Sequence, residues 1–287
     1  MIRIHPVLRV TALLGAGILV TSLLACTGVT ASKPSTAGGS DRSITFVTPG
    51  KLTIATGQPA YFPWVIDDKP ESGKGFESAV AISVAIKLGF LPKNIVWVRS
   101  TFDQAIAPGA KDFDFNLQQF SITEERKANV DFSLPYYETT QAVITVKGSK
   151  AEGAKTIADL HDLIVGAQTG TTSFAAIEAQ IKPKTGARAF NSNDDAKLAL
   201  QSGTIDALVV DLPTAFYLTG AELTGGKIIG QLPKRTGTGD QLGIVLAKGS
   251  SLTKKVDAAI EGLKAEGTID RLSTQWLTNA ADAPVLK

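Results

Sequence analysis

Two neighbouring stretches, residues 114–126 (DFNLQQFSITEER) and residues 130–136 (VDFSLPY), carry the most information about the fold and the site. The first begins as a β-type run that ends near Leu117, and polar residues then lead to Arg126. The arginine guanidinium is a planar, permanently charged fork that can hold a carboxylate through two hydrogen bonds. Arg126 is therefore a candidate carboxylate clamp, with Ser121 as a further hydroxyl donor.

The acidic neighbours of Arg126 allow a second interpretation. Glu124 and Glu125 precede it directly, as acidic residues often do at the start of a helix. Arg126 would then be an ordinary surface residue of that helix. Composition alone does not decide between the two.

Outward from these stretches, β-type runs alternate with amphipathic helical runs. The expected strands are 51–55, 95–98, 112–117, 142–146, 163–166, 207–210 and 243–247. The expected helices are 76–89, 172–181, 194–202 and 251–277, the last span holding one or two helices. This alternation predicts an α/β fold with mostly parallel sheets flanked by helices. The pattern restarts near Leu163, which predicts two lobes.

A turn with glycine and threonine follows one of the later strands, in residues 165–173 (VGAQTGTTS). The helix expected next would begin at Thr171 or Thr172. Unpaired N–H groups and the positive end of the dipole attract an anion to a helix N-terminus. The alternative is that these threonines are caps and nothing more, since threonine caps helices well.

A buried strand ends in an acid in residues 206–212 (DALVVDL). Asp211 stands at the carboxyl end of this strand, the edge at which open α/β sheets bind ligands. Its carboxylate could accept hydrogen bonds from an ammonium group. The alternative is that Asp211 caps a helix over residues 213–216.

Together these stretches resemble the polar amino-acid-binding proteins of ABC importers, a type II periplasmic-binding-protein family. The resemblance rests on the order and spacing of residues 121–123 (SIT), Arg126 and residues 131–136 (DFSLPY), and it extends over about residues 52–277. It implies a two-lobed fold with a two-strand hinge near residues 137–145 and 239–245. Lobe 1 would comprise residues 44–140 and 245–287, and lobe 2 residues 141–244.

The resemblance also implies roles for single residues. Arg126 would hold the α-carboxylate of a free amino acid, with Thr171 and Thr172 facing it across the cleft. Asp211 would hold the α-amino group. The closed form would be recognised by an ABC permease in the cell membrane.

Five further residues correspond to positions of the family's ligand pocket. Tyr61 matches an aromatic residue that stacks on the ligand and gives apolar contact at low entropic cost. Gln58 stands where some relatives have an aspartate. Because glutamine carries no negative charge, this replacement disfavours a cationic ligand side chain. Gln118, Gln119 and Phe120 replace the small residues and the methionine-like residue that are usual there. The two amides favour a ligand with a polar or small neutral side chain.

The N-terminus predicts export and lipid anchoring. Residues 11–25 are apolar and uncharged and follow two arginines, but they are too few to span a bilayer. This is the pattern of a secretory signal, expected here over residues 1–25. The stretch LLAC that ends at Cys26 resembles the lipobox of bacterial lipoproteins, so Cys26 is the expected lipidation site. The alternative is an uncleaved anchor followed by a free or buried cysteine.

A flexible tether is expected over residues 26–43, which are small and polar with no apolar period. Removal of residues 1–25 takes away Arg3 and Arg9 but no acid. The 29 basic residues then become 27, against 27 acidic ones. A neutral chain has no electrostatic basis for binding nucleic acid, and none is expected as a partner.

The residues also argue against several chemistries. One cysteine and one histidine outside the signal, His161, cannot build a metal cluster. The nucleophile elbow of acyl-transfer enzymes is absent from the sequence. The chain is therefore expected to be a monomeric, extracytoplasmic binding protein without cofactor, metal or catalytic residues.

Two rival functions share this fold. One is a cyclohexadienyl or arogenate dehydratase, which needs a general acid in the cleft; Glu77 and Glu138 are its candidates. The other is the ligand-sensing subunit of a signalling system.

Overall fold

The computed structural model describes residues 44–234, 237–277 and 283–287. All of them belong to one unit, Arg42–Lys287. The expected signal, the tether and Cys26 lie outside the described residues. Within the described ranges no helix is long and apolar enough to cross a bilayer.

The first sheet has five strands in the order β2-β1-β3-β12-β4. Their bounds are Leu52–Thr56 (β1), Ile95–Arg99 (β2), Phe115–Asn116 (β3), Val130–Phe132 (β4) and Val245–Ala247 (β12). β1 pairs in parallel with β2 and β3, whereas β12 is antiparallel to β3 and β4. All five residues of β1 are buried, because helices cover both faces of this sheet.

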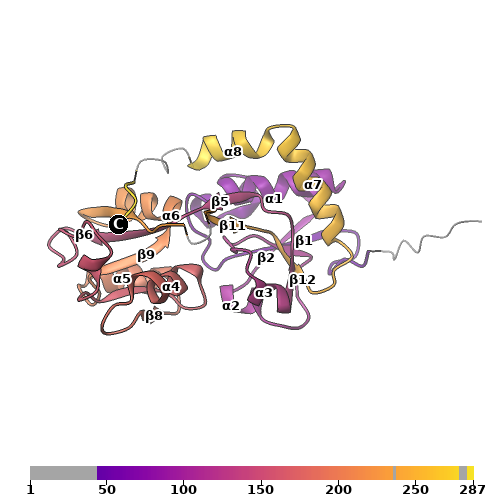
Figure 1. The fold of residues 1–287 in the computed structure, drawn as a ribbon. Coiled ribbons are helices and arrows are strands. Elements are labelled where there is room, and N and C mark those ends of the chain that lie inside the picture. Colours follow the sequence, from indigo (N-terminus) through magenta and orange to yellow (C-terminus); the bar gives the residue numbers. More distant parts are fainter. Residues whose placement is uncertain (1–43, 235–236, 278–282) are drawn as a thin grey trace, which may run out of the picture. The chain divides into compact units, whose positions relative to one another are not determined.

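Two groups of helices cover the first sheet (Figure 1). One group consists of α1 (Phe76–Lys87), α7 (Thr253–Ala265) and α8 (Thr268–Leu277), which also contact one another. α1 buries Val80, Ala81, Val84 and Ala85 at helical spacing in the main core cluster. The other face carries the short helices α2 (Phe102–Ile106) and α3 (Glu124–Asn129).

The second sheet has the order β10-β6-β9-β7-β8. The strands are Gln141–Val146 (β6), Val165–Gln168 (β7), Arg188–Phe190 (β8), Ala207–Asp211 (β9) and Gly226–Gln231 (β10). Its helices are Thr172–Ala176 (α4), Asn193–Gln201 (α5) and Leu212–Tyr217 (α6), with π-helical turns at Ile177–Ile181 (η5) and Leu218–Glu222 (η6). Along β9, Ala207 and Val209 enter one core cluster, and Leu208 and Val210 enter the other. This alternation is that of a strand buried on both faces.

Short 3-10 turns complete the described structure at Ile66–Asp68 (η1), Pro70–Ser72 (η2), Pro92–Asn94 (η3) and Ala158–Leu160 (η4).

The two-lobed α/β class is confirmed, but the sheets are mixed rather than mostly parallel. Each has three adjacent parallel strands, and its remaining pairs are antiparallel. The strand expected over 112–117 is shorter in the structure, where β3 covers Phe115–Asn116, and the Asp114 carboxylate adds side-chain contacts beside it. It accepts hydrogen bonds from the N–H groups of Val47 (2.9 Å) and Thr53 (2.7 Å).

A two-stranded antiparallel sheet lies where the chain passes between the two larger sheets (Figure 1). β5 (Tyr137–Thr139) connects β4 to β6, and β11 (Asp240–Leu242) connects β10 to β12. These two strands occupy the segments in which the sequence predicts a hinge.

The last residues of the chain return to the second sheet. The carbonyl of Pro284 accepts a hydrogen bond from the N–H of Gln231 (2.7 Å), and the N–H of Leu286 donates to the Gln231 carbonyl (2.8 Å). The Leu286 side chain is buried in the core cluster of that sheet. The expected boundary, which assigns residues 245–287 to lobe 1, is therefore wrong for residues 283–287.

Candidate ligand-binding site

One cavity is lined by residues from two sides, one belonging to the part of the chain that holds the first sheet and the other to the part that holds the second sheet. Every expected site residue except Gln58 and Phe120 is among its lining residues: Tyr61, Gln118, Gln119, Ser121, Arg126, Thr171, Thr172 and Asp211. The same cavity is lined by Thr56, Gly57, Pro59, Ala60, Phe102, Gln168, Ser173, Asn193, Val210 and Thr214. Among the described residues no cluster of histidine, cysteine or acidic side chains could hold a metal.

Arg126 is buried in this cavity, with 6 % of its surface exposed. Its Nη1 donates to the carbonyl of Ser121 (2.7 Å), and its Nη2 donates to the carbonyl of Gly170 (2.9 Å) on the side of the second sheet. The guanidinium also lies over the ring of Phe102, 5.1 Å from the centroid. The interpretation of Arg126 as a surface residue is therefore wrong.

The charge of Arg126 has no ionic partner within the described part of the chain. No carboxylate there lies within 4.0 Å of the guanidinium. Desolvation lowers the pKa of Arg126, against the attraction of Asp211 and Asp240. Arginine nevertheless stays protonated in proteins. A buried and unpaired positive charge is unfavourable, so the site is suited to an anion.

The threonines opposite Arg126 have different tasks. The Thr171 hydroxyl accepts from the N–H of Phe174 (3.1 Å) and donates to the Gln168 carbonyl (2.7 Å), so it caps α4. The Thr172 hydroxyl lies 3.1 Å from that of Ser121, a contact between the two sides of the cavity. Of the two hydroxyls, that of Thr172 is the one oriented toward the opposite side.

Asp211 ends β9, lines the cavity and is partly buried there. It occupies the N-cap position of α6, but its side chain makes no capping hydrogen bond. Instead it accepts from Nε2 of Gln141 (2.8 Å). Burial raises the pKa of Asp211 to about 7, with the nearby charge of Asp240 as the second cause; the Gln141 hydrogen bond and Arg126 act in the opposite direction.

The two glutamines differ in what they offer to a ligand. Gln119 has a φ of 50°, and its backbone N–H donates to Oε1 of Glu77 (2.7 Å). Its side-chain amide donates to the same carboxylate, as does the Tyr136 hydroxyl. The hydrogen-bond donors of Gln119 are therefore already bound to Glu77. In Gln118, by contrast, Oε1 is buried and has no hydrogen-bond partner among the described residues.

Two expected site residues lie away from the cavity. Phe120 is completely buried, and its ring packs 5.0 Å from that of Phe102, beneath the arginine. Gln58 is exposed to solvent and does not line the cavity, whereas the next residue, Pro59, does. Both assignments as contact residues are corrected accordingly.

The sequence alone leaves open whether three further residues, Trp64, Phe102 and Glu138, line the pocket. Phe102 lines the cavity. Trp64 belongs to the core, and its Nε1 donates to Oγ1 of Thr214 (3.1 Å) across the two sides. Glu138 lies outside the cavity and pairs with Lys234 (2.9 Å).

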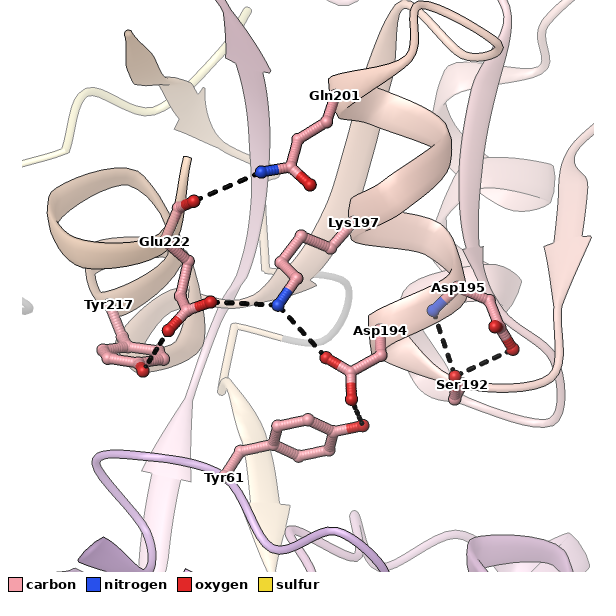
Figure 2. A network of polar contacts seen from close by, with 8 residues as sticks. All are labelled: Tyr61, Ser192, Asp194, Asp195, Lys197, Gln201, Tyr217 and Glu222. Carbon is pink, nitrogen blue, oxygen red and sulfur yellow. Dashed lines mark hydrogen bonds and ion pairs between the residues drawn. The ribbon is translucent and has the colours of Figure 1, made fainter. Parts of the chain in front are cut away.

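Tyr61 reaches the second side through a polar network (Figure 2). Its ring lines the cavity, and its hydroxyl donates to Oδ2 of Asp194 in α5 (3.4 Å). Asp194 pairs with Lys197 (3.3 Å), which also pairs with Glu222 (3.0 Å), and Glu222 accepts from the Tyr217 hydroxyl (2.6 Å). Burial is the main cause that raises the pKa of Tyr61, so its hydroxyl remains a donor.

Sequence reasoning missed Gln141, Gln168 and Asn193. Gln168 and Asn193 line the cavity, whereas Gln141 lies outside its lining and donates a hydrogen bond to Asp211. Gln141 is the polar first residue of a strand whose next three residues are apolar, a position usually occupied by a solvated residue. Its one signal is that it lies within the expected hinge.

The fold and the site define a two-lobed solute-binding protein of the type II periplasmic class. The model of the bacterial extracellular solute-binding proteins, family 3, matches residues 52–279, and the chain belongs to this family. The resemblance to polar amino-acid-binding proteins noted in the sequence is thereby confirmed.

Named relatives and solved structures agree with this assignment. An L-arginine-binding protein of Pseudomonas aeruginosa is 31% identical over 189 residues, which are 63% of this chain and 72% of the relative. An ancestral arginine-binding protein bound to arginine is 32% identical with a TM-score of 0.66, over 79% of this chain and 98% of the other. An ancestral amino acid-binding protein, described as a precursor of cyclohexadienyl dehydratase, is 30% identical with a TM-score of 0.63, over 79% and 95%.

Proposed function

We propose that the protein captures a free amino acid in this cavity and delivers it to the permease of an ABC importer. The observation that carries the proposal is the guanidinium of Arg126, buried without a carboxylate partner among the described residues. An α-carboxylate would supply the missing charge through bidentate hydrogen bonds. Asp211, which lines the same cavity, would accept from the α-ammonium group.

The side chain of the ligand is proposed to be neutral, and polar or small. Arg126 and Asp211 are the charged residues that line the cavity, and a zwitterion's main-chain groups would use both. A cationic side chain would need a further carboxylate in the cavity to offset its desolvation. The unpaired Oε1 of Gln118 and the amide of Asn193 offer hydrogen bonds to a polar neutral group instead.

Capture is proposed to close a hinge. The lobes would be residues 44–140 with 245–277, and residues 141–244 with 283–287, connected by β5 and β11. A ligand gripped from both sides stabilises the closed form because it binds that form better than the open one. The protein would act as a monomer, tethered outside the cytoplasm by residues 26–43 and by a lipid on Cys26.

A dehydratase activity has no comparable support. Its candidate acids do not line the cavity: Glu77 is buried beneath Gln119, and Glu138 pairs with Lys234 outside it. The solved relative associated with that enzyme is itself described as amino acid-binding. We therefore propose a binding protein and not an enzyme.

A thermal-shift screen of the common L-amino acids tests this function. A ligand at a hundred times its Kd stabilises the folded state by about 2.7 kcal/mol, which corresponds to about 5–10 °C in Tm for a protein of this size. We expect shifts of this order for neutral polar amino acids and smaller ones for arginine and lysine. If no amino acid raised Tm, or if arogenate were converted to an aromatic product, the proposal would be wrong.

A further inference from the structure

Two carboxylates from different strands meet at one amide group beside the cavity. Nε2 of Gln141 donates to Oδ1 of Asp211 (2.8 Å) and to Oδ2 of Asp240 (2.7 Å). Oε1 of Gln141 accepts from the hydroxyl of Ser173 (2.6 Å). An ionised Asp240 carboxylate can only accept, and the Ser173 hydroxyl donates to Oε1, so these two contacts fix the orientation of the amide.

Asp240 lies outside the cavity, on the hinge strand β11. No lysine or arginine of the described residues lies within 4.0 Å of its carboxylate. Its negative charge therefore acts on the other carboxylate held by Gln141. A like charge at such close range disfavours ionisation.

The remaining titratable groups around Asp211 are few. Arg126 favours the carboxylate form of Asp211, and Glu77 opposes it. The pKa values of Tyr136 and Tyr137 are raised mainly by burial and to a smaller extent by the charge of Asp211. Both tyrosines therefore stay neutral near pH 7. Desolvation and the charge of Asp240 outweigh the Gln141 hydrogen bond and the charge of Arg126, and the pKa of Asp211 rises to about 7.

We propose that Asp240 is a positioning residue for the amino-acid site: its charge, held beside Asp211 by the shared amide of Gln141, keeps a proton on Asp211 until the ligand's ammonium group displaces it. The zwitterion enters with its ammonium group intact, Asp211 becomes a carboxylate, and its proton leaves to solvent. Ligand binding is thus coupled to proton release, and the strength of this coupling depends on the charge of Asp240 on the hinge strand β11. This inference rests on the proposed function for the ligand and on the described structure for the two carboxylates.

The coupling has a definite sign. Below the pKa of Asp211 in the unliganded protein, each pH unit weakens binding up to about tenfold, because the proton must first leave. Near pH 7, about half a proton is released for each ligand bound. Affinity therefore rises from pH 6 to pH 8 and then levels off.

Carboxyl ¹³C NMR of the unliganded protein tests the role of Asp240 without any ligand. We expect the Asp211 carboxyl to titrate near pH 7 in the wild type and at least about one pH unit lower in Asp240→Asn. Asp240→Ser serves as a second variant if the first does not fold. Glu138→Gln removes a carboxylate from the same two-stranded sheet and should leave the titration unchanged. An Asp211 that titrates near pH 4 in the wild type, or equally in all folded variants, overturns the proposal.

Calorimetry with L-glutamine in buffers of different ionisation enthalpy then tests the displacement. Wild type and Glu138→Gln should release about half a proton at pH 7, and Asp240→Asn much less. Binding without proton release in the wild type contradicts the inference but leaves the proposed function intact. Failure of L-glutamine to bind counts against the proposed ligand class, while the NMR titration still decides the role of Asp240.

Discussion

Three ionisable side chains set the chemistry at the scale of single residues: the buried Arg126 and Glu77 and the partly buried Asp211. The sequence identified Arg126 and Asp211, because each stands at a fixed offset from a strand that can be recognised. The partners of Glu77 and of Gln141 could not be predicted in this way. Gln119, the partner of Glu77, lies 42 residues further along the chain, and Asp240 lies 99 residues from Gln141. Such contacts depend on how the elements pack, and no local pattern encodes them.

Glu77 should make the stability of the protein depend on pH. Burial raises its pKa to about 7 in the folded state, above the ordinary value of 4.5. The folded state thus holds this proton more firmly than the unfolded state. The resulting stabilisation is present below pH 4.5 and is lost as the pH rises through 7. The loss is on the order of 3–4 kcal/mol, at about 1.4 kcal/mol for each pKa unit.

Urea unfolding between pH 5 and pH 8 measures this effect. The free energy of unfolding of Glu77→Gln should decline less with pH than that of the wild type. The decline that remains is the contribution of Asp211. The control, Glu138→Gln, alters an exposed carboxylate whose pKa is lowered by Lys234 and Gly239, so it should follow the wild type in this range. Equal slopes for all three proteins would show that Glu77 is ionised in the folded state at pH 5.

At the scale of elements, the positions of the longer helices and of most strands were predictable from apolar periodicity, whereas the short helix α2 was not expected. The direction of several strands was not. β12 and β6 follow the hinge strands, and each enters its sheet antiparallel to its neighbours, a reversal that no local pattern reveals. The return of residues 283–287 to β10 was missed for a similar reason, because so short a segment has no periodicity of its own.

The C-terminal segment should contribute measurably to the stability of the second lobe. Leu286 is 3 % exposed within the core cluster of that lobe, whereas its neighbour Val285 is 59 % exposed. Leu286→Ala should therefore lower the free energy of unfolding by about 2–4 kcal/mol through loss of burial and a residual cavity. Val285→Ala is the matched control and should change it by less than about 0.5 kcal/mol. Equal midpoints of urea unfolding for the two variants would show that the segment is not docked.

At the scale of the whole molecule, several polar contacts join the two sides of the cavity. They include the hydrogen bonds from Arg126 to Gly170, from Tyr61 to Asp194 and from Trp64 to Thr214. Polar contacts of this kind can be exchanged for hydrogen bonds with water at small net cost. The ligand's charged ends, held from both sides, are thus the proposed source of the energy that keeps the protein closed.

Titration calorimetry of Arg126→Ala, with the amino acid that gives the largest thermal shift, tests this central claim most directly. Removing the buried guanidinium should weaken binding by about 2–5 kcal/mol, or roughly 30-fold or more in Kd. Lys127→Ala, which removes the adjacent exposed charge, should bind as the wild type does. If Arg126→Ala bound the amino acid with the wild-type Kd, the buried arginine would not be its carboxylate clamp, and the account would be contradicted.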